Sequence, residues 1–135
     1  MTWGTSHFGG DSSLVAEKLA SGVTSIYSTG RAFAAVKEGG EVVTWGDDFF
    51  GADSSHVAEK LASGVTSIYN TWGSFAAMKD RGEVVTWGHE DDGADSSYVA
   101  EQLASGVTSI HSNDGAFAAV KERGEVVTWG DLDFG

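Results

Sequence analysis

The sequence predicts an all-β fold made of β-propeller blades, because one 42-residue unit occurs three times along 135 residues. A repeat period between about 20 and 50 residues is typical of solenoids and propellers. Each unit contains three short segments rich in β-branched, aromatic and small apolar residues, separated by turns that contain glycine. The units span residues 4–45, 46–87 and 88–129, and residues 2–9 and 128–135 are two copies of one terminal segment.

Three β-strands are predicted in each unit, and the first unit illustrates them. Residues 23–27 alternate β-branched or aromatic residues with polar ones, which is typical of a half-buried strand. Residues 32–37 form a second apolar segment, whose small alanines let neighbouring sheets approach closely. A glycine-containing hairpin turn at residues 38–40 leads into a third strand at residues 41–46. Each unit is therefore predicted to fold as a three-stranded meander.

The segment before each meander is predicted to form either one to two helical turns or an irregular crossover. Asp11-Ser12-Ser13 supplies candidate N-cap residues in the first unit. Gly22 lies where a glycine is expected after the end of a helix. A segment this short gains little from helical propensity alone, so the sequence leaves both interpretations open. The apolar positions of the segment are Val15, Ala16, Leu19 and Ala20.

Charge and cysteine content exclude several classes of function. The chain carries 20 acidic and 8 basic residues, for a net charge of −12. Phosphate backbones and anionic membrane surfaces attract positive charge, so neither a nucleic acid nor a membrane is predicted as a partner. Cysteine is absent, which excludes disulfides and thiolate zinc sites. The first residues lack the layout of a signal peptide, so a cytoplasmic location is expected if Met1 is the native start.

Three motifs recur in every unit. Gly-Glu-Val-Val-Thr-Trp-Gly occurs at residues 40–46, 82–88 and 124–130, together with Ser-Gly-Val-x-x-Ile and Phe-Ala-Ala-Val/Met-Lys. They resemble the repeat family named after the regulator of chromosome condensation, in particular its short-repeat branch, which includes a propeller-type β-lactamase inhibitor protein. The resemblance implies propeller blades over essentially the whole chain, and its motifs are specific for fold rather than function. The wedge hairpin of the exchange-factor branch is absent, so guanine-nucleotide exchange is not implied.

Three blades are too few for a closed propeller, which typically has about four to eight. Each end of a three-blade row exposes a face built to pack on another blade, which is an aggregation hazard. We therefore expect head-to-tail self-association, with two chains forming six blades favoured over three chains forming nine. The two terminal copies then compete for one position, and the complete strand at residues 125–130 is expected to prevail. The incomplete copy also suggests a fragment of a longer repeat array or an engineered chain.

The units differ mainly in two groups of positions, one directly after the third strand and one between the first and second strands. Because the first and third strands of a meander end at the same rim, both groups are predicted to lie on one face. Exposed aromatic side chains in loops on a rigid scaffold are typical anchors of a protein interface. Drift of unconstrained loops explains the same variation equally well. The predicted partner-binding residues are Phe8, Arg31, Phe49, Phe50, Trp72, His89 and Asp114.

No catalytic residue, cofactor or metal site is predicted. The four histidines occupy four different repeat positions and match no metalloprotease or triad pattern. Acidic turns followed by glycine resemble part of a calcium-binding loop, but the complete loop is missing. The tryptophans of the Thr-Trp-Gly motif are instead predicted to pack in the core or between blades, as Trp45, Trp87 and Trp129.

These observations favour a non-enzymatic propeller module that binds a protein partner through its loop face. The main alternative is a structural or engineered repeat fragment with no ligand of its own. A calcium- or sugar-binding module, or a hydrolase that uses the acidic rim, is less favoured.

Overall fold

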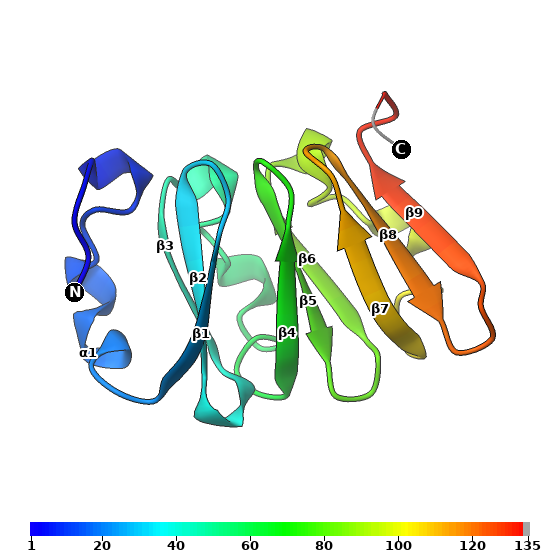
Figure 1. Ribbon diagram of the computed structural model, residues 1–135, viewed down its shortest axis with the longest axis horizontal. Coiled ribbons are helices and arrows are strands. Elements are labelled where there is room, and N and C mark those ends of the chain that lie inside the picture. Colours follow the sequence, from blue (N-terminus) through cyan, green and yellow to red (C-terminus); the bar gives the residue numbers. More distant parts are fainter. Residues whose placement is uncertain (134–135) are drawn as a thin grey trace.

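The computed structural model describes residues 1–133 as a row of three antiparallel sheets, each of three strands in the order first–second–third. Figure 1 shows the sheets side by side, with the two chain termini at opposite ends of the row. The predicted all-β fold of three blades is thereby confirmed. The strands are β1 (Val23–Ser28), β2 (Ala32–Lys37) and β3 (Val42–Gly46) in blade 1, β4 (Val65–Asn70), β5 (Ser74–Lys79) and β6 (Val84–Gly88) in blade 2, and β7 (Val107–Ser112), β8 (Ala116–Lys121) and β9 (Val126–Gly130) in blade 3.

The three meanders share one register. In blade 1, Ile26 of β1 pairs with Ala35 of β2, and Ala35 pairs with Val43 of β3. The register shifts between Val23 and Ser25, and the same irregularity occurs at the same position in the other two blades. The repeated bulge and the repeated pairing follow from the repeated sequence, so equivalent residues in the three blades can be compared directly.

The segments before the meanders are mostly 3₁₀ turns. Within residues 1–133, only the first of these segments contains an α-helix, α1 (Ala16–Leu19). The helical interpretation is therefore correct for the first unit, and the irregular crossover is correct for the other two. Such short segments cannot offset the entropic cost of helix nucleation by themselves. Six 3₁₀ turns of the described residues lie outside the meanders: Ser6–Phe8, Ser13–Val15, Asp48–Phe50, Ser55–Val57, Glu90–Asp92 and Ser97–Val99. Another, Glu38–Gly40, lies in the hairpin between β2 and β3. None of the helices described is long and apolar enough to cross a membrane.

Neighbouring blades pack through apolar faces. At the boundary between blades 1 and 2, the cluster contains Ile68 and Leu61 from blade 2 and the small Ala34 from blade 1. At the next boundary, Ile110 and Leu103 lie in the same kind of cluster with Ala76. Each boundary therefore places branched apolar side chains of one blade against the alanine-rich middle strand of the blade before it, where small side chains allow close approach.

Acid is expected to weaken the crossover turns. Asp53 and Asp95 each accept the hydroxyl of a serine two residues on, Ser55 or Ser97, at 2.6 Å and its backbone N–H at 3.0 Å. These bonds, the hydroxyl bond first, hold the pKa of both carboxyls below the ordinary aspartate value. A lowered pKa in the folded state stabilises the fold above the unfolded-state pKa of about 3.9, and the contribution is lost as pH falls through the folded-state pKa.

Thermal melting followed by circular dichroism between about pH 7 and pH 2 measures this contribution. The Tm should fall with acid in the natural chain and fall less in an Asp53→Asn/Asp95→Asn variant, whose amide oxygens still accept but no longer titrate. An equal fall in both proteins would show that the two turns do not contribute.

Candidate functional site

One rim of the row of blades is formed by two sets of loops. The first set connects the first and second strands of each blade, at residues 28–31, 70–73 and 112–115. The second set directly follows a third strand at residues 47–50 and 89–92, and residues 5–8 lie at the equivalent position before blade 1. We call these loops together the variable rim; they lie along the upper edge of the view in Figure 1. The N–H of Gly30 donates to the carbonyl of Trp72 at 2.8 Å, and the N–H of Trp72 donates to that of Asp114 at 2.8 Å. The three strand-connecting turns are thus joined into one strip.

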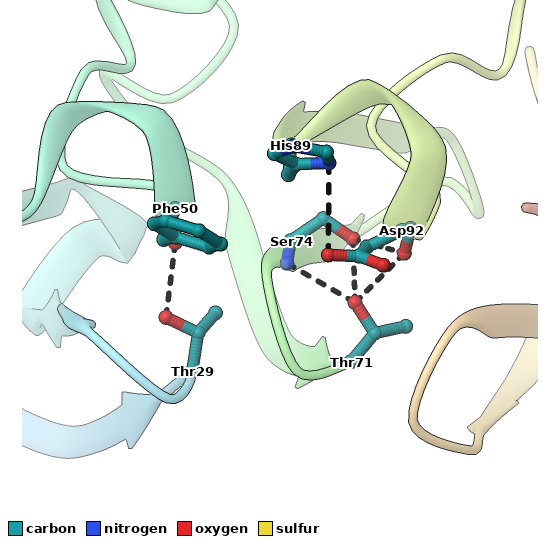
Figure 2. Close-up of polar contacts among 6 residues, drawn as sticks. All are labelled: Thr29, Phe50, Thr71, Ser74, His89 and Asp92. Atoms are coloured by element: carbon teal, nitrogen blue, oxygen red, sulfur yellow. Dashed lines mark hydrogen bonds and ion pairs between the residues drawn. The ribbon is translucent and has the colours of Figure 1, made fainter.

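Hydroxyl groups fasten the two loops of each of the first two blades to each other. Thr29 donates from Oγ1 to the carbonyl of Phe50 at 2.9 Å, and Thr71 donates to the carbonyl of Asp92 at 2.7 Å. Ser74 donates from Oγ to that same Asp92 carbonyl at 2.6 Å. Figure 2 shows both groups of contacts. Such bonds fix loop backbones that would otherwise move independently, so the rim is a scaffolded surface.

An aromatic cluster surrounds one arginine at the junction of blades 1 and 2. The guanidinium carbon of Arg31 lies 4.9 Å from the ring centre of Phe8, 5.1 Å from that of Phe50 and 5.8 Å from that of Trp72. Its Nη1 lies 3.7 Å from Oδ2 of Asp47. Contacts of this kind contribute about 0.5–1 kcal/mol each at exposed sites. The arginine therefore links rings from three loops that are far apart in sequence.

Phe50 is the central ring of this cluster. It meets Trp72 edge to face, with centroids 5.0 Å apart, and stacks on His89 at 5.4 Å. His89 in turn has Nδ1 3.7 Å from Oδ2 of Asp92, a separation too long for a hydrogen bond, and Nδ1 has no hydrogen-bond partner among the described residues. Burial raises the pKa of the Asp92 carboxyl, and the nearby histidine only partly opposes that shift. The contact between His89 and Asp92 is accordingly a loose one.

Close approach of the Trp72 ring explains a glycine in the neighbouring blade. A Cβ atom at position 30 would lie 2.8 Å from the indole of Trp72, so no side chain fits there without moving the ring. Gly30 and Trp72 occupy the same position in successive units. The sequence difference between the units is therefore complementary at this point: the small residue of blade 1 makes room for the large residue of blade 2.

The structure brings five of the seven predicted rim residues into contact through their side chains: Phe8, Arg31, Phe50, Trp72 and His89. Asp114 joins through its backbone carbonyl, and Phe49 extends into solvent with 78% of its surface exposed. The sequence placed Asp47 on this face as an acidic residue but did not single out Thr29, Thr71 and Ser74, whose hydroxyl groups hold the rim loops together. The recurrence of threonine at the same position in two units was the available signal.

Comparisons with known proteins identify the fold. No protein-family model and no curated protein sequence matches the chain. Yeast RCC1 (Prp20) in its complex with Kap60 aligns with a TM-score of 0.57 and 15% identity, over 82% of this chain and 30% of that one. The structure of Prp20p from Saccharomyces cerevisiae, studied with its binding to Gsp1p and histones, gives 0.57 and 15%, over 82% and 31%. Human WBSCR16 gives 0.52 and 19%, over 80% and 34%.

The chain has the fold of RCC1-type propeller blades. This finding confirms the fold that the recurring motifs imply. The chain spans about a third of the length of these proteins, whose identity to it is below 20%.

Each RCC1-type blade carries the same tryptophan socket. The indoles of Trp45, Trp87 and Trp129 are buried and stack at 5.3 Å on Phe33, Phe75 and Phe117. Their Nε1 groups donate to the carbonyls of Gly9, Gly51 and Gly93 at 3.0–3.1 Å. Trp3 has the same Thr-Trp-Gly context but is 85% exposed, because residues 1–5 are in no strand. The tryptophan of the Thr-Trp-Gly motif is therefore buried only where the motif belongs to a third strand paired with the middle strand of its blade.

Two equivalent grooves lie between successive crossovers, beside β3 and β6. One has a volume of about 760 Å³ and the other about 610 Å³, and a lysine–glutamate pair lies at each, Lys18 with Glu41 at 3.1 Å and Lys60 with Glu83 at 2.8 Å. Repetition of the same residues in both grooves indicates a structural role. Within residues 1–133, no group of three or more histidine, aspartate or glutamate side chains is placed to hold a metal ion.

Proposed function

We propose that this chain is a non-enzymatic propeller repeat module that assembles head to tail and presents the variable rim to a protein partner. The observation that carries the proposal is a difference in exposure between equivalent residues. Side chains that are buried at the two internal blade boundaries are exposed at the two ends of the row. The ends are therefore a matched pair of surfaces.

At the end formed by blade 1, the first strand presents an uncovered apolar side chain. Ile26 is 57% exposed, whereas its equivalents Ile68 and Ile110 are 2% and 3% exposed. Leu19 is likewise only partly buried, while its equivalents Leu61 and Leu103 are each 2% exposed. Ile68 and Ile110 are covered by residues of the blade before them, and Ile26 has no such blade beside it, so this end resembles one half of a blade boundary.

At the other end, blade 3 presents the complementary surface. Val126 is 59% exposed, whereas Val42 and Val84 are 8% and 7% exposed at internal boundaries. Burying an apolar side chain of this size stabilises an assembly by about 1.5–3 kcal/mol. Docking blade 3 of one copy on blade 1 of a second copy would repeat the internal packing, with Ile26 of the second copy placed as Ile68 and Ile110 are.

Backbone hydrogen bonds across the boundaries support the same arrangement. Val42 donates its N–H to the carbonyl of Leu61, and Val84 donates to that of Leu103, each at 2.9 Å. Continuing the series, the N–H of Val126 would donate to the carbonyl of Leu19 in a second copy. A head-to-tail contact closes into a ring when its rotation fits a whole number of copies. Two copies give six blades, within the usual range for propellers, and three copies give nine.

The variable rim is the surface that we assign to a protein partner. Trp72 is 48% exposed beside the largely exposed Phe49, and both lie on the rim loops held by the hydrogen bonds described above, whereas Phe8, 45% exposed, contacts Arg31 from the N-terminal segment. Aromatic and arginine side chains on rigid loops dominate binding energy in many interfaces. The structural neighbours are also protein-binding: yeast RCC1 is seen with Kap60, and Prp20p binds Gsp1p and histones.

Sedimentation equilibrium tests the assembly directly. The monomer mass is 14.1 kDa, and the expected result is a stable species of twice that mass, or three times for a nine-blade ring. A mass that stays at the monomer value at every accessible concentration would rule out the proposed assembly.

Alanine substitution of the exposed rim aromatics is expected to separate binding from assembly. A Phe49→Ala/Trp72→Ala variant should lose a protein captured by the natural chain from an extract of its source, because about 2 kcal/mol or more is typical for a central aromatic anchor. Its sedimentation mass should stay the same, since neither residue lies on an end face. Tyr98→Ala, at a 94% exposed position outside the rim, is the matched control and should retain capture. Equal capture by all three proteins would contradict a binding role for the rim.

A further inference from the structure

The N-terminal segment occupies a site that recurs on every blade. In blades 2 and 3, the segment that follows the preceding third strand lies over the stacked Phe–Trp pair, with Gly51 on Phe75 and Gly93 on Phe117. In blade 1 the corresponding segment, around Gly9, follows no strand of the described residues and fills the place over Phe33. At each of the three positions an added Cβ would lie 2.4–2.6 Å from the phenylalanine ring, so the fit is equally close. Residues 1–10 thus complete blade 1 as a linker from another blade would.

The hydroxyl contacts of the segment show which strand it stands in for. Thr44 at the end of β3 donates to the carbonyl of Ala52 at 2.7 Å and contacts Ser54 Oγ at 2.9 Å. Thr2 makes the corresponding contacts, with the carbonyl of Gly10 at 3.2 Å and with Ser12 Oγ at 2.8 Å. The repeat position of Thr2 is that of Thr128 in β9. The N-terminal segment therefore stands where β9 of a preceding blade would stand.

Its attachment is weaker than that of the strands it imitates. Thr44, Thr86 and Thr128 belong to strands paired with the middle strand of their sheet. Thr2 belongs to no strand, and the tryptophan after it is 85% exposed instead of buried. The segment is held by a few polar contacts, one close glycine and the contact of Phe8 with Arg31, without a ladder of backbone hydrogen bonds, so it opens at a lower free-energy cost than a paired strand.

We propose that residues 1–10 cap blade 1 and that β9 of a second copy displaces them when two chains join. This inference rests on the proposed head-to-tail assembly. Docking blade 3 on blade 1 of another copy puts Thr128 of the incoming chain where Thr2 of the receiving chain lies, and both cannot occupy one position. Thr128 arrives as part of a paired strand with a buried Trp129, so it replaces the contacts of Thr2 and brings the ladder that Thr2 lacks.

The cap regulates assembly by competition. A chain whose blade 1 is capped cannot accept β9, so its apparent affinity is reduced by the fraction of chains with the cap open. The two terminal copies of the motif, residues 2–9 and 128–135, are thereby alternative occupants of one site. Residues 134 and 135 of the second copy lie outside the described residues, and the competition described concerns Thr2 and Thr128.

A reversible disulfide tests the cap. The natural chain has no cysteine, and Thr2 Oγ1 lies 2.8 Å from Ser12 Oγ. Cysteines at these two positions would therefore bring their sulfur atoms within reach of a disulfide bond, whose length is about 2.0 Å. Oxidised Thr2→Cys/Ser12→Cys should stay at the monomer mass of 14.1 kDa in sedimentation equilibrium, and reduction should restore assembly. Thr86→Cys/Ser96→Cys, the equivalent pair within the chain at 2.8 Å, is the matched control and should assemble in both redox states. Assembly of the oxidised Thr2→Cys/Ser12→Cys chain would overturn the proposal.

Removal of the cap provides a second measurement that does not depend on disulfide formation. A chain beginning at Asp11, without residues 1–10, should assemble at a concentration about tenfold lower than the full chain, because no segment competes for the site. Equal assembly of the two chains would overturn the cap and leave head-to-tail association intact. If neither chain assembles, the proposed association itself is wrong. If only the shortened chain assembles, residues 1–10 block the site and β9 does not displace them, which would overturn the proposal.

Discussion

Replacing Trp87 with alanine is expected to lower the free energy of unfolding by about 3–5 kcal/mol. Trp87 is fully buried, stacks on Phe75 at 5.3 Å and donates from Nε1 to the carbonyl of Gly51 at 3.0 Å. Truncation removes the ring from an interior that cannot collapse around the space, and it leaves a buried carbonyl without its donor. A domain of this size is stable by only about 5–15 kcal/mol, so the loss is a large part of the total.

Urea denaturation at one fixed protein concentration measures this loss, because association makes apparent stability depend on concentration. Trp3→Ala is the matched control: it removes the same ring from the same Thr-Trp-Gly sequence, but at an 85% exposed position. Its effect should be within about 0.5 kcal/mol of zero. Equal midpoints for the natural chain and Trp87→Ala would show that the socket is not a source of stability.

The repeat made most of the fold predictable. Strand positions follow from the alternation of apolar and polar residues and from the glycine turns. Because the unit repeats, the strands predicted in the first unit apply to all three units. The predicted ranges of β1, β2 and β3 agree with the structure to within one residue at each end. The helix at Ala16–Leu19 and the turns at the equivalent residues 58–61 and 100–103 of the other units could not be told apart. Segments of this length differ by fractions of a turn, which local propensity does not resolve.

The rim was predictable as a location but not as a set of contacts. Two strand ends of a meander meet at one edge, which brings the variable loops together whatever their sequence. That Arg31 would lie among three rings, or that Gly30 would make room for Trp72, depends on side chains of neighbouring blades. Predicting such contacts requires the spacing and orientation of neighbouring blades, which cannot be read from the sequence. Trp3 shows the converse limit, since its motif predicts burial and only the missing strand beside it explains its exposure.

A single charge placed on either end face is expected to abolish assembly by itself. Ile26→Asp puts a carboxylate on the open face of blade 1, and Val126→Asp puts one on the open face of blade 3. Both positions are more than half exposed in the single chain, so the fold should tolerate either change. In the assembly the carboxylate would be buried without a partner, which should weaken association about a hundredfold or more. Each variant alone should therefore sediment at 14.1 kDa. Tyr98→Asp should assemble as the natural chain does, because its repeat equivalents Leu14 and His56 stay exposed beside the internal boundaries.

Mixing the two charged variants distinguishes a head-to-tail contact from a symmetric one. The Ile26→Asp chain keeps its blade 3 face, and the Val126→Asp chain keeps its blade 1 face, so together they can form one natural junction. The mixture should yield an open pair of twice the monomer mass, weaker than the natural ring because its second junction carries both carboxylates. In a symmetric dimer each face would meet its own copy, so one of the two variants would dimerise alone and mixing would add nothing. Dimerisation of either single variant would contradict the head-to-tail arrangement, whereas a pair formed only on mixing would establish which face meets which.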